Sequence, residues 1–129
     1  MKIEEFLKSL PNNIISGDNV QLPEYSLRRI FKFLDLNEKD IFYHLGCGNG
    51  KGIAIASEEF NVKKAVGVEN NKENIQQAEK LLKKKNLKNI ELLYEDVRTA
   101  KINDATVVLF WFTDSDIRSE EHTSELQSQ

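Results

Sequence analysis

The stretch "IFYHLGCGNGKG", residues 41–52, decides the fold of this 129-residue chain. It begins with a mostly apolar run of the kind that forms a buried strand. Behind that run, glycine occupies every second position from Gly46 to Gly52. Because glycine has no Cβ, the backbone at these positions can approach a ligand closely. We therefore expect a strand that ends in a ligand-binding loop.

Strand-like and helix-like segments alternate around this loop. Before it, apolar spacing predicts a helix from Pro23 to about Leu36 and a short amphipathic helix over residues 3–10. After it, the expected elements are a helix over 52–60, a strand over 65–69, a helix over 71–86, and strands over 90–96 and 106–112. This order predicts an α/β fold with a parallel sheet and helices on both faces. The glycine loop then lies where the strand order reverses and a crevice opens for a nucleotide-like ligand.

The spacing of the loop argues against two common nucleotide-binding motifs. A Walker A loop needs Ser or Thr after its lysine, whereas Gly52 follows Lys51. A dinucleotide fingerprint needs a third glycine at a position that is occupied here by Lys51 or Ile53. What remains is a bare loop followed by an acid at the end of the next strand, Glu69, nineteen residues after Gly50.

With these features the chain resembles the N-terminal half of a class I S-adenosylmethionine-dependent methyltransferase. Motif I is "HLGCGNG", motif II is "GVEN", motif III is "YEDV" and motif IV is "ATVVLFWF". The resemblance covers roughly residues 22–116 and implies a Rossmann-like sheet with S-adenosyl-L-methionine as the cofactor. The helix "LPEYSLRRIFKFLDL" before motif I is similar to that of the small archaeal non-SET protein lysine methyltransferases. It makes protein lysine the leading methyl acceptor, ahead of RNA or a small molecule.

The same resemblance implies a set of cofactor-binding residues. These are His44, Gly46, Gly48, Asn49, Gly50, Glu69, Asn70, Asp96 and Val97. Glu69 would accept hydrogen bonds from both ribose hydroxyls, and Asp96 would meet the adenine amino group. A solvated loop acid is the alternative for each. Asn70 would border the adenine or ribose, or else it caps the helix that follows.

Two positions depart from the family pattern, because motif I usually has Asp or Glu where this chain has His44, and often Asp where it has Asn49. A neutral imidazole can accept a hydrogen bond from the methionine amino group, whereas a protonated one repels it. We therefore expect weak cofactor binding, or binding that changes with pH between about 6 and 8. An acid nearby that compensates for the missing one is the alternative.

The end of the last strand would stand beside the transferable methyl group. Phe110, Trp111 and Phe112 are the candidates for an apolar wall that excludes water. Because strand side chains alternate, Phe110 and Phe112 share one face and Trp111 takes the other. Methyl transfer depends chiefly on holding the reacting atoms in line. We expect no acid–base constellation.

The chain divides into an N-terminal helix and loop (1–21), a partial methyltransferase domain (22–117) and a polar tail (118–129). The tail "RSEEHTSELQS" resembles the translation of a sequencing adapter, which indicates that the domain is truncated after its fourth strand. The fourth strand would then be an exposed apolar edge. We expect poor solubility and no turnover from the fragment itself.

Composition narrows the remaining options. A net charge of −3, a single cysteine, and no bilayer-length apolar run predict a cytoplasmic protein without a metal site, a DNA partner or membrane attachment. One alternative is a catalytically inactive cofactor-binding or scaffold domain. Another is an RNA-binding module, or simply a solvated helix end, formed by the lysines at positions 80, 83, 84, 85 and 88.

Overall fold

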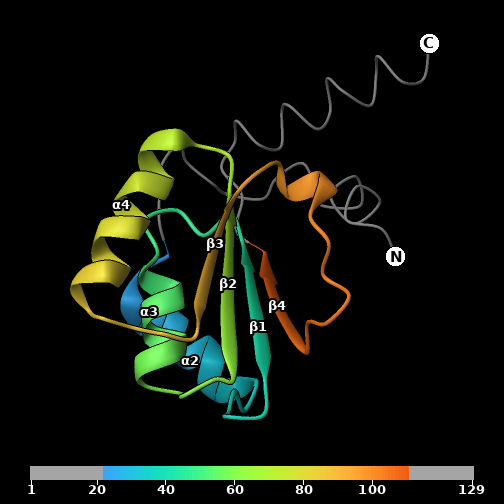
Figure 1. Cartoon of the computed structure of the whole chain (residues 1–129). Coiled ribbons are helices and arrows are strands. Elements are labelled where there is room, and N and C mark those ends of the chain that lie inside the picture. The colour runs from blue at the N-terminus through green and yellow to red at the C-terminus, as the bar shows by residue number, and fades with distance from the viewer. Residues whose placement is uncertain (1–21, 111–129) are drawn as a thin grey trace. The chain divides into compact units, whose positions relative to one another are not determined.

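The structure, a computed structural model, describes residues 22–110. Its centre is a parallel four-stranded sheet in the order β3-β2-β1-β4 (Figure 1). The strands are β1 (Ile41–Leu45), β2 (Lys64–Glu69), β3 (Ile90–Tyr94) and β4 (Val107–Phe110). The chain steps outward from β1 to β3 and then returns to the other side of β1 for β4. The predicted parallel α/β sheet is confirmed, and the glycine loop leaves β1 at the point where the strand order reverses.

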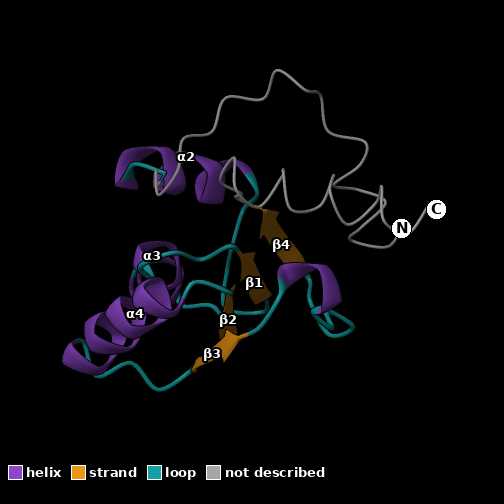
Figure 2. Ribbon diagram, turned by 90° about the horizontal axis from the view of Figure 1, so that it is seen from above, coloured by secondary structure: helices purple, strands orange, loops and turns teal. Residues whose placement is uncertain are grey.

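The three α-helices of residues 22–110 lie on the same side of the sheet (Figure 2). They are α2 (Glu24–Phe33), α3 (Lys51–Glu58) and α4 (Lys72–Lys84). On the other side lies the connection between β3 and β4, which includes the short 3₁₀ helix η1 (Val97–Thr99). Within the described residues, the predicted helical layer is therefore present on one face. The helix predicted over residues 3–10 lies outside the described part of the chain.

Helix α2 ends three residues earlier than its apolar pattern predicts. Asp35 adopts a left-handed conformation with φ of 54°. The amide of Leu36 donates to the carbonyl of Phe31 at 3.0 Å, and the amide of Asp35 donates to that of Lys32 at 3.1 Å. These two bonds form a Schellman motif, with Leu36 and Phe31 both buried against the same core. Leu36 thus belongs to the C-terminal capping motif and not to the helix itself.

The layer between the sheet and the helices is built around aromatic rings. Phe31 of α2 is fully buried and meets the rings of Phe42 and Phe60 edge-on, with centroids 5.1 and 5.5 Å away. Such edge-to-face pairs stabilise beyond the area they bury. Since side chains alternate along β1, Phe42 and His44 face the helices while Tyr43 faces the other side of the sheet.

On that other side, Tyr43 ties the β3–β4 connection to the central strand. Its hydroxyl donates to the carboxylate of Asp104 at 2.6 Å. This hydrogen bond, with burial as a second cause, raises the pKa of Tyr43 to about 12. The same bond holds the pKa of Asp104 below its ordinary value. The connection, whose only helix within the described residues is the short η1, is thereby fixed over β1.

Candidate functional site

The sequence motifs meet at the carboxyl ends of β1, β2 and β3. The glycine loop follows β1, Glu69 is the last residue of β2, and Asp96 comes two residues after β3 ends. Strand register brings them close, because Leu45 pairs with Val68 and Glu69 pairs with Tyr94. The structure thus gathers the predicted motifs I, II and III at one edge of the sheet.

The glycine loop needs glycine for its conformation. Gly46, Gly48 and Gly50 have φ values of 83°, 54° and 86°, in the left-handed region that other residues rarely adopt. The amides of Gly46 and Cys47 both donate to the carbonyl of Val68, at 2.8 and 3.1 Å. The loop therefore folds over the end of β2, next to Glu69.

The carboxylate of Glu69 joins two turns of the site. One oxygen accepts a hydrogen bond from the Gly48 amide at 2.9 Å, and the other accepts one from the Asn71 amide at 3.0 Å. The residue is only 7% exposed. An ionised carboxylate offers about four acceptor positions, so about two remain after these bonds. Glu69 can therefore both hold the turns and accept hydrogen bonds from a pair of hydroxyl groups.

Asp96 is engaged by a neighbour that the sequence did not single out. Its carboxylate forms a close ion pair with the Arg98 guanidinium and accepts from the Arg98 amide at 2.9 Å, which caps η1. The side-chain hydrogen bonds from Arg98 lower the pKa of Asp96. Val97 is buried at the start of η1. Asp96 thus stays ionised at the end of β3, with Arg98 fixing its orientation.

The two asparagines after β2 have different environments. Asn71 is the N-cap of α4, and its side chain accepts from the Asn74 amide at 3.0 Å. The alternative that Asn70 caps this helix is therefore wrong. Asn70 is exposed between Glu69 and the cap. In the glycine loop, Asn49 is partly exposed, and its side-chain oxygen accepts from the Lys51 amide at 3.2 Å.

His44 points into the layer between β1 and α3. Both ring nitrogens are buried and have no hydrogen-bond partner among the described residues. A Cβ placed on Gly52 would lie 2.7 Å from Nδ1 and 2.9 Å from Cε1 of this ring. The predicted contact with a methionine amino group is therefore not available in this conformation, because the protein interior encloses both nitrogens.

Burial also changes the titration of His44, lowering its pKa from 6.5 to about 4. The imidazole is then neutral throughout the range from about pH 6 to 8. This burial gives no support to the expectation that His44 makes cofactor affinity depend on pH in that range, and the expectation stays a prediction. Titration of His44 should instead affect folding at lower pH.

Of the candidate methyl-site wall, only Phe110 lies within the described residues. It is the last residue of β4, pairs in register with Leu45 and is partly buried. Trp111 and Phe112 lie outside the described part of the chain.

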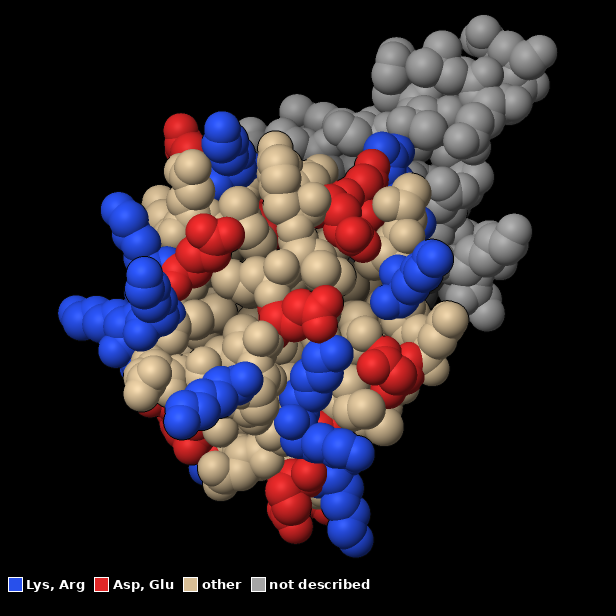
Figure 3. All heavy atoms as spheres, in the orientation of Figure 1, with Lys and Arg blue, Asp and Glu red and all other residues tan. Residues whose placement is uncertain are grey.

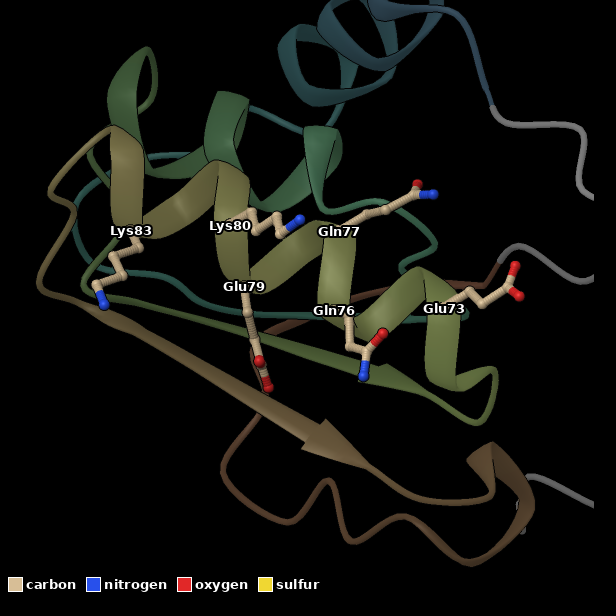
Figure 4. A pocket seen from close by; sticks show the side chains of 6 residues that line it. All are labelled: Glu73, Gln76, Gln77, Glu79, Lys80 and Lys83. Atoms are coloured by element: carbon tan, nitrogen blue, oxygen red, sulfur yellow. The ribbon is translucent and has the colours of Figure 1, made fainter.

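A surface hollow lies away from these motifs, along α4 (Figure 4). Its lining residues are Glu73, Gln76, Gln77, Glu79, Lys80 and Lys83. They are polar or charged, and all come from α4. Within residues 22–110, no group of three His, Cys, Asp or Glu side chains is placed to hold a metal ion, and no helix has the length and apolarity to cross a membrane.

The strand order, the glycine loop at its reversal and the acid ending β2 define an α/β domain of the nucleotide-binding type. Residues 36–110 match the family described as a methyltransferase domain. This match covers more than half of the 129 residues. The chain belongs to the methyltransferase domain family.

One curated relative carries a more specific name. The protein-lysine N-methyltransferase of Saccharolobus islandicus (strain REY15A) is 49% identical over 59 residues, which are 46% of this chain and 37% of that protein. The chain thus matches little more than a third of the length of this relative.

Solved structures show the same fold. The RNA methyltransferase from Salinibacter ruber, in complex with S-adenosyl-L-homocysteine, is 28% identical with a TM-score of 0.70, over 74% of this chain and 63% of that one. The SAM-dependent methyltransferase from Thiobacillus denitrificans, in complex with the same compound, is 13% identical with a TM-score of 0.65, over 90% of this chain and 46% of that one. The predicted class I methyltransferase fold is confirmed.

The close contact between His44 and Gly52 predicts that the effect of Gly52→Ala on stability changes sign when the imidazole is removed. Gly52→Ala should destabilise the protein by about 1–3 kcal/mol, because the new methyl group meets a buried ring that has no room to move. In a His44→Ala background the same change should be neutral or stabilising by up to about 1 kcal/mol, since alanine favours the helix. Urea unfolding of the four proteins of this cycle measures both effects. Equal destabilisation in the two backgrounds would contradict the contact.

The buried imidazole also predicts acid sensitivity. The pKa of His44 is about 4 when folded and 6.5 when unfolded, so the unfolded state takes up the proton first and stability falls as the pH drops below 6.5. Between about pH 7.5 and 5, this group should cost the fold about 2 kcal/mol. The measurement is urea unfolding at the two pH values for wild type and His44→Leu. The loss should be smaller in the variant by that amount, and an equal loss would refute the assignment.

Proposed function

We propose that this chain is the cofactor-binding part of an S-adenosyl-L-methionine-dependent methyltransferase that acts on protein lysine in the cytoplasm. The observation that carries the proposal is the carboxylate of Glu69, which is buried, holds the Gly48 and Asn71 amides, and keeps acceptor capacity. A vicinal diol such as the ribose of a nucleoside matches two acceptors on one carboxylate.

The residues around Glu69 fit the rest of such a cofactor. The loop of Gly46, Gly48 and Gly50 would lie against its methionine part, since the left-handed turns leave backbone without side chains there. Asp96, oriented by Arg98, would accept from the adenine amino group beside the buried Val97. Asn70 and Asn49 would border the nucleoside and the loop. Phe110, Trp111 and Phe112 remain the proposed wall at the methyl group.

S-adenosyl-L-methionine, when bound, supplies a methyl group on a positively charged sulfur. The chain's contribution is to hold the nucleoside in a fixed direction, which sets the line along which an acceptor must approach. Apolar side chains at the end of β4 would exclude water from that line. In this proposal His44 has no contact with the cofactor, so another group must hold the amino group.

Protein lysine is favoured as the acceptor by the relative of that name, which is 49% identical over 59 residues. RNA is the second candidate, because the Salinibacter ruber structure is that of an RNA methyltransferase and is 28% identical to this chain. A catalytically inactive scaffold is the alternative within the same fold, and the enclosed position of His44 favours it.

Calorimetric titration of S-adenosyl-L-homocysteine into the chain tests the cofactor proposal. We expect one site per chain and, for Glu69→Gln, an affinity lower by about tenfold or more, because hydrogen bonds to a charged acceptor contribute about 1.5–3 kcal/mol. Glu79→Gln removes the same charge from the exposed face of α4 and should bind like wild type. Unchanged binding by Glu69→Gln contradicts the site. No binding by a folded wild-type chain supports the scaffold.

The acceptor is tested with the uninterrupted gene from the source organism and cofactor carrying a labelled methyl group. We expect label to enter lysine-rich protein and to be lost when the lysine amines are first blocked by reductive dimethylation. Purified RNA in place of protein is the competing acceptor. Label in RNA alone would overturn the lysine proposal and leave the cofactor site standing.

A further inference from the structure

The outer face of α2 combines two exposed aromatic rings with two exposed cations. Tyr25 is 66% exposed and Phe33 is 89% exposed. Arg29 and Lys32 are exposed on the same helix. At 100° per residue, these four side chains fall within an arc of about 100°. They lie opposite the buried residues Leu27 and Phe31, so none of the four is needed by the core.

The charges on this face are not neutralised by their neighbours. Arg28 forms a two-pronged ion pair with Glu59, at 2.8 to 3.1 Å, and reaches Glu24 at 3.9 Å. Arg28 is therefore engaged by Glu59 and Glu24. Lys32 contributes to lowering the pKa of Glu59, after the dominant effect of Arg28. Arg29 and Lys32 form no ion pair with any described residue.

The combination of exposed rings and exposed cations on this helix selects among anionic partners. Tyr25, Arg29 and Phe33 are four residues apart, so the rings are about 12 Å apart along the axis with a cation about midway. A single strand offers bases to both rings and a phosphate to the cation between them. Bases stack on exposed aromatic rings, and phosphates pair with Arg or Lys. An acidic peptide would use the cations and leave two rings without a partner.

We propose that the outer face of α2, formed by Tyr25, Arg29, Lys32 and Phe33, binds single-stranded RNA. The net charge of −3 gives the chain no long-range attraction for nucleic acid. Acidic side chains lie among the basic ones on the face shown in Figure 3. Binding is therefore local, and it depends on stacking as much as on charge. This surface is separate from the proposed cofactor site and goes beyond the proposed function.

The lysines of α4 provide the contrasting case. Lys80 and Lys83 stand on a helix face with Glu73, Glu79 and two glutamines, and no aromatic residue is among them. Lys85 is paired with Glu58 at 2.9 Å. Bases therefore have no aromatic ring to stack on at this face of α4. The RNA-binding module that the α4 lysines suggested from the sequence is thus better placed on α2.

Fluorescence anisotropy with a labelled oligouridylate RNA tests the proposal on the whole chain. We expect salt-sensitive binding that weakens by about fivefold or more for each of Tyr25→Leu and Phe33→Leu, the range for one lost stacking contact. In Arg29→Gln/Lys32→Gln, the slope of log affinity against log salt should fall by about 1.4, since each single-strand phosphate contributes about 0.7. The matched control Lys80→Gln/Lys83→Gln removes the same charge from α4 and should bind like wild type.

Four results would overturn the proposal: no RNA binding at low salt, unchanged binding by the leucine variants, loss of binding in the α4 control, or tighter binding to polyglutamate than to RNA. Binding to anionic lipid vesicles with none to RNA would assign the face to membranes and would also overturn it. All variants change exposed residues, and circular dichroism of each variant is the check that it folds like wild type. Titration of S-adenosyl-L-homocysteine into the α2 variants separates the RNA proposal from the cofactor proposal, because each can fail while the other stands.

Discussion

The carboxylate of Glu69 is the interaction on which the candidate site depends. It bonds to an amide of the glycine loop and to the amide of the residue that caps α4. Gly48, 21 residues before Glu69, and Asn71, two residues after it, are thereby held at one point. Without the carboxylate, both amides would be left without an acceptor, at a cost of about 1–3 kcal/mol for each if buried. One side chain thus shapes the site and presents acceptors to it.

The glycines of this region serve two different purposes. Gly46, Gly48 and Gly50 have positive φ values, which the loop requires. A Cβ on Gly50 would also lie 2.9 Å from the Cβ of Ala78, so this residue allows α3 and α4 to approach each other. Gly52 and Gly67 have no positive φ. Glycine is needed there because a Cβ would be too close to His44 and to Cys47, respectively. The alternate glycines that indicated a bare ligand-binding loop therefore include one that makes room for an imidazole.

The features that could be predicted from the sequence are those that depend on periodicity and order. Alternating strands and helices were sufficient for the parallel sheet, and the acid at the end of β2 was found by its distance from the loop. The end of α2 was missed because Asp35, a residue without glycine's freedom, takes the left-handed position. The partner of Asp96 was missed because Arg98 binds it at close sequence range, where no periodic signal exists. The orientation of His44 depends on which face of β1 the helices cover. This is decided by tertiary packing and has no signal in the local sequence.

The connection between β3 and β4, which crosses the face of the sheet opposite the helices, has a further consequence. Residues 95–106 are anchored at both ends, because the Glu95 amide donates to the Glu69 carbonyl at 3.1 Å and the Thr106 amide donates to the Ile41 carbonyl at 2.9 Å. Between these ends, η1 and the bond between Tyr43 and Asp104 hold the segment. Because the two ends are fixed to β2 and β1, the middle of this segment can change in length without shifting β3 or β4. Loop closure becomes only about 0.6 kcal/mol more costly for each doubling of loop length. The middle of this crossing can therefore lengthen at small cost while the neighbouring ligand edge stays intact.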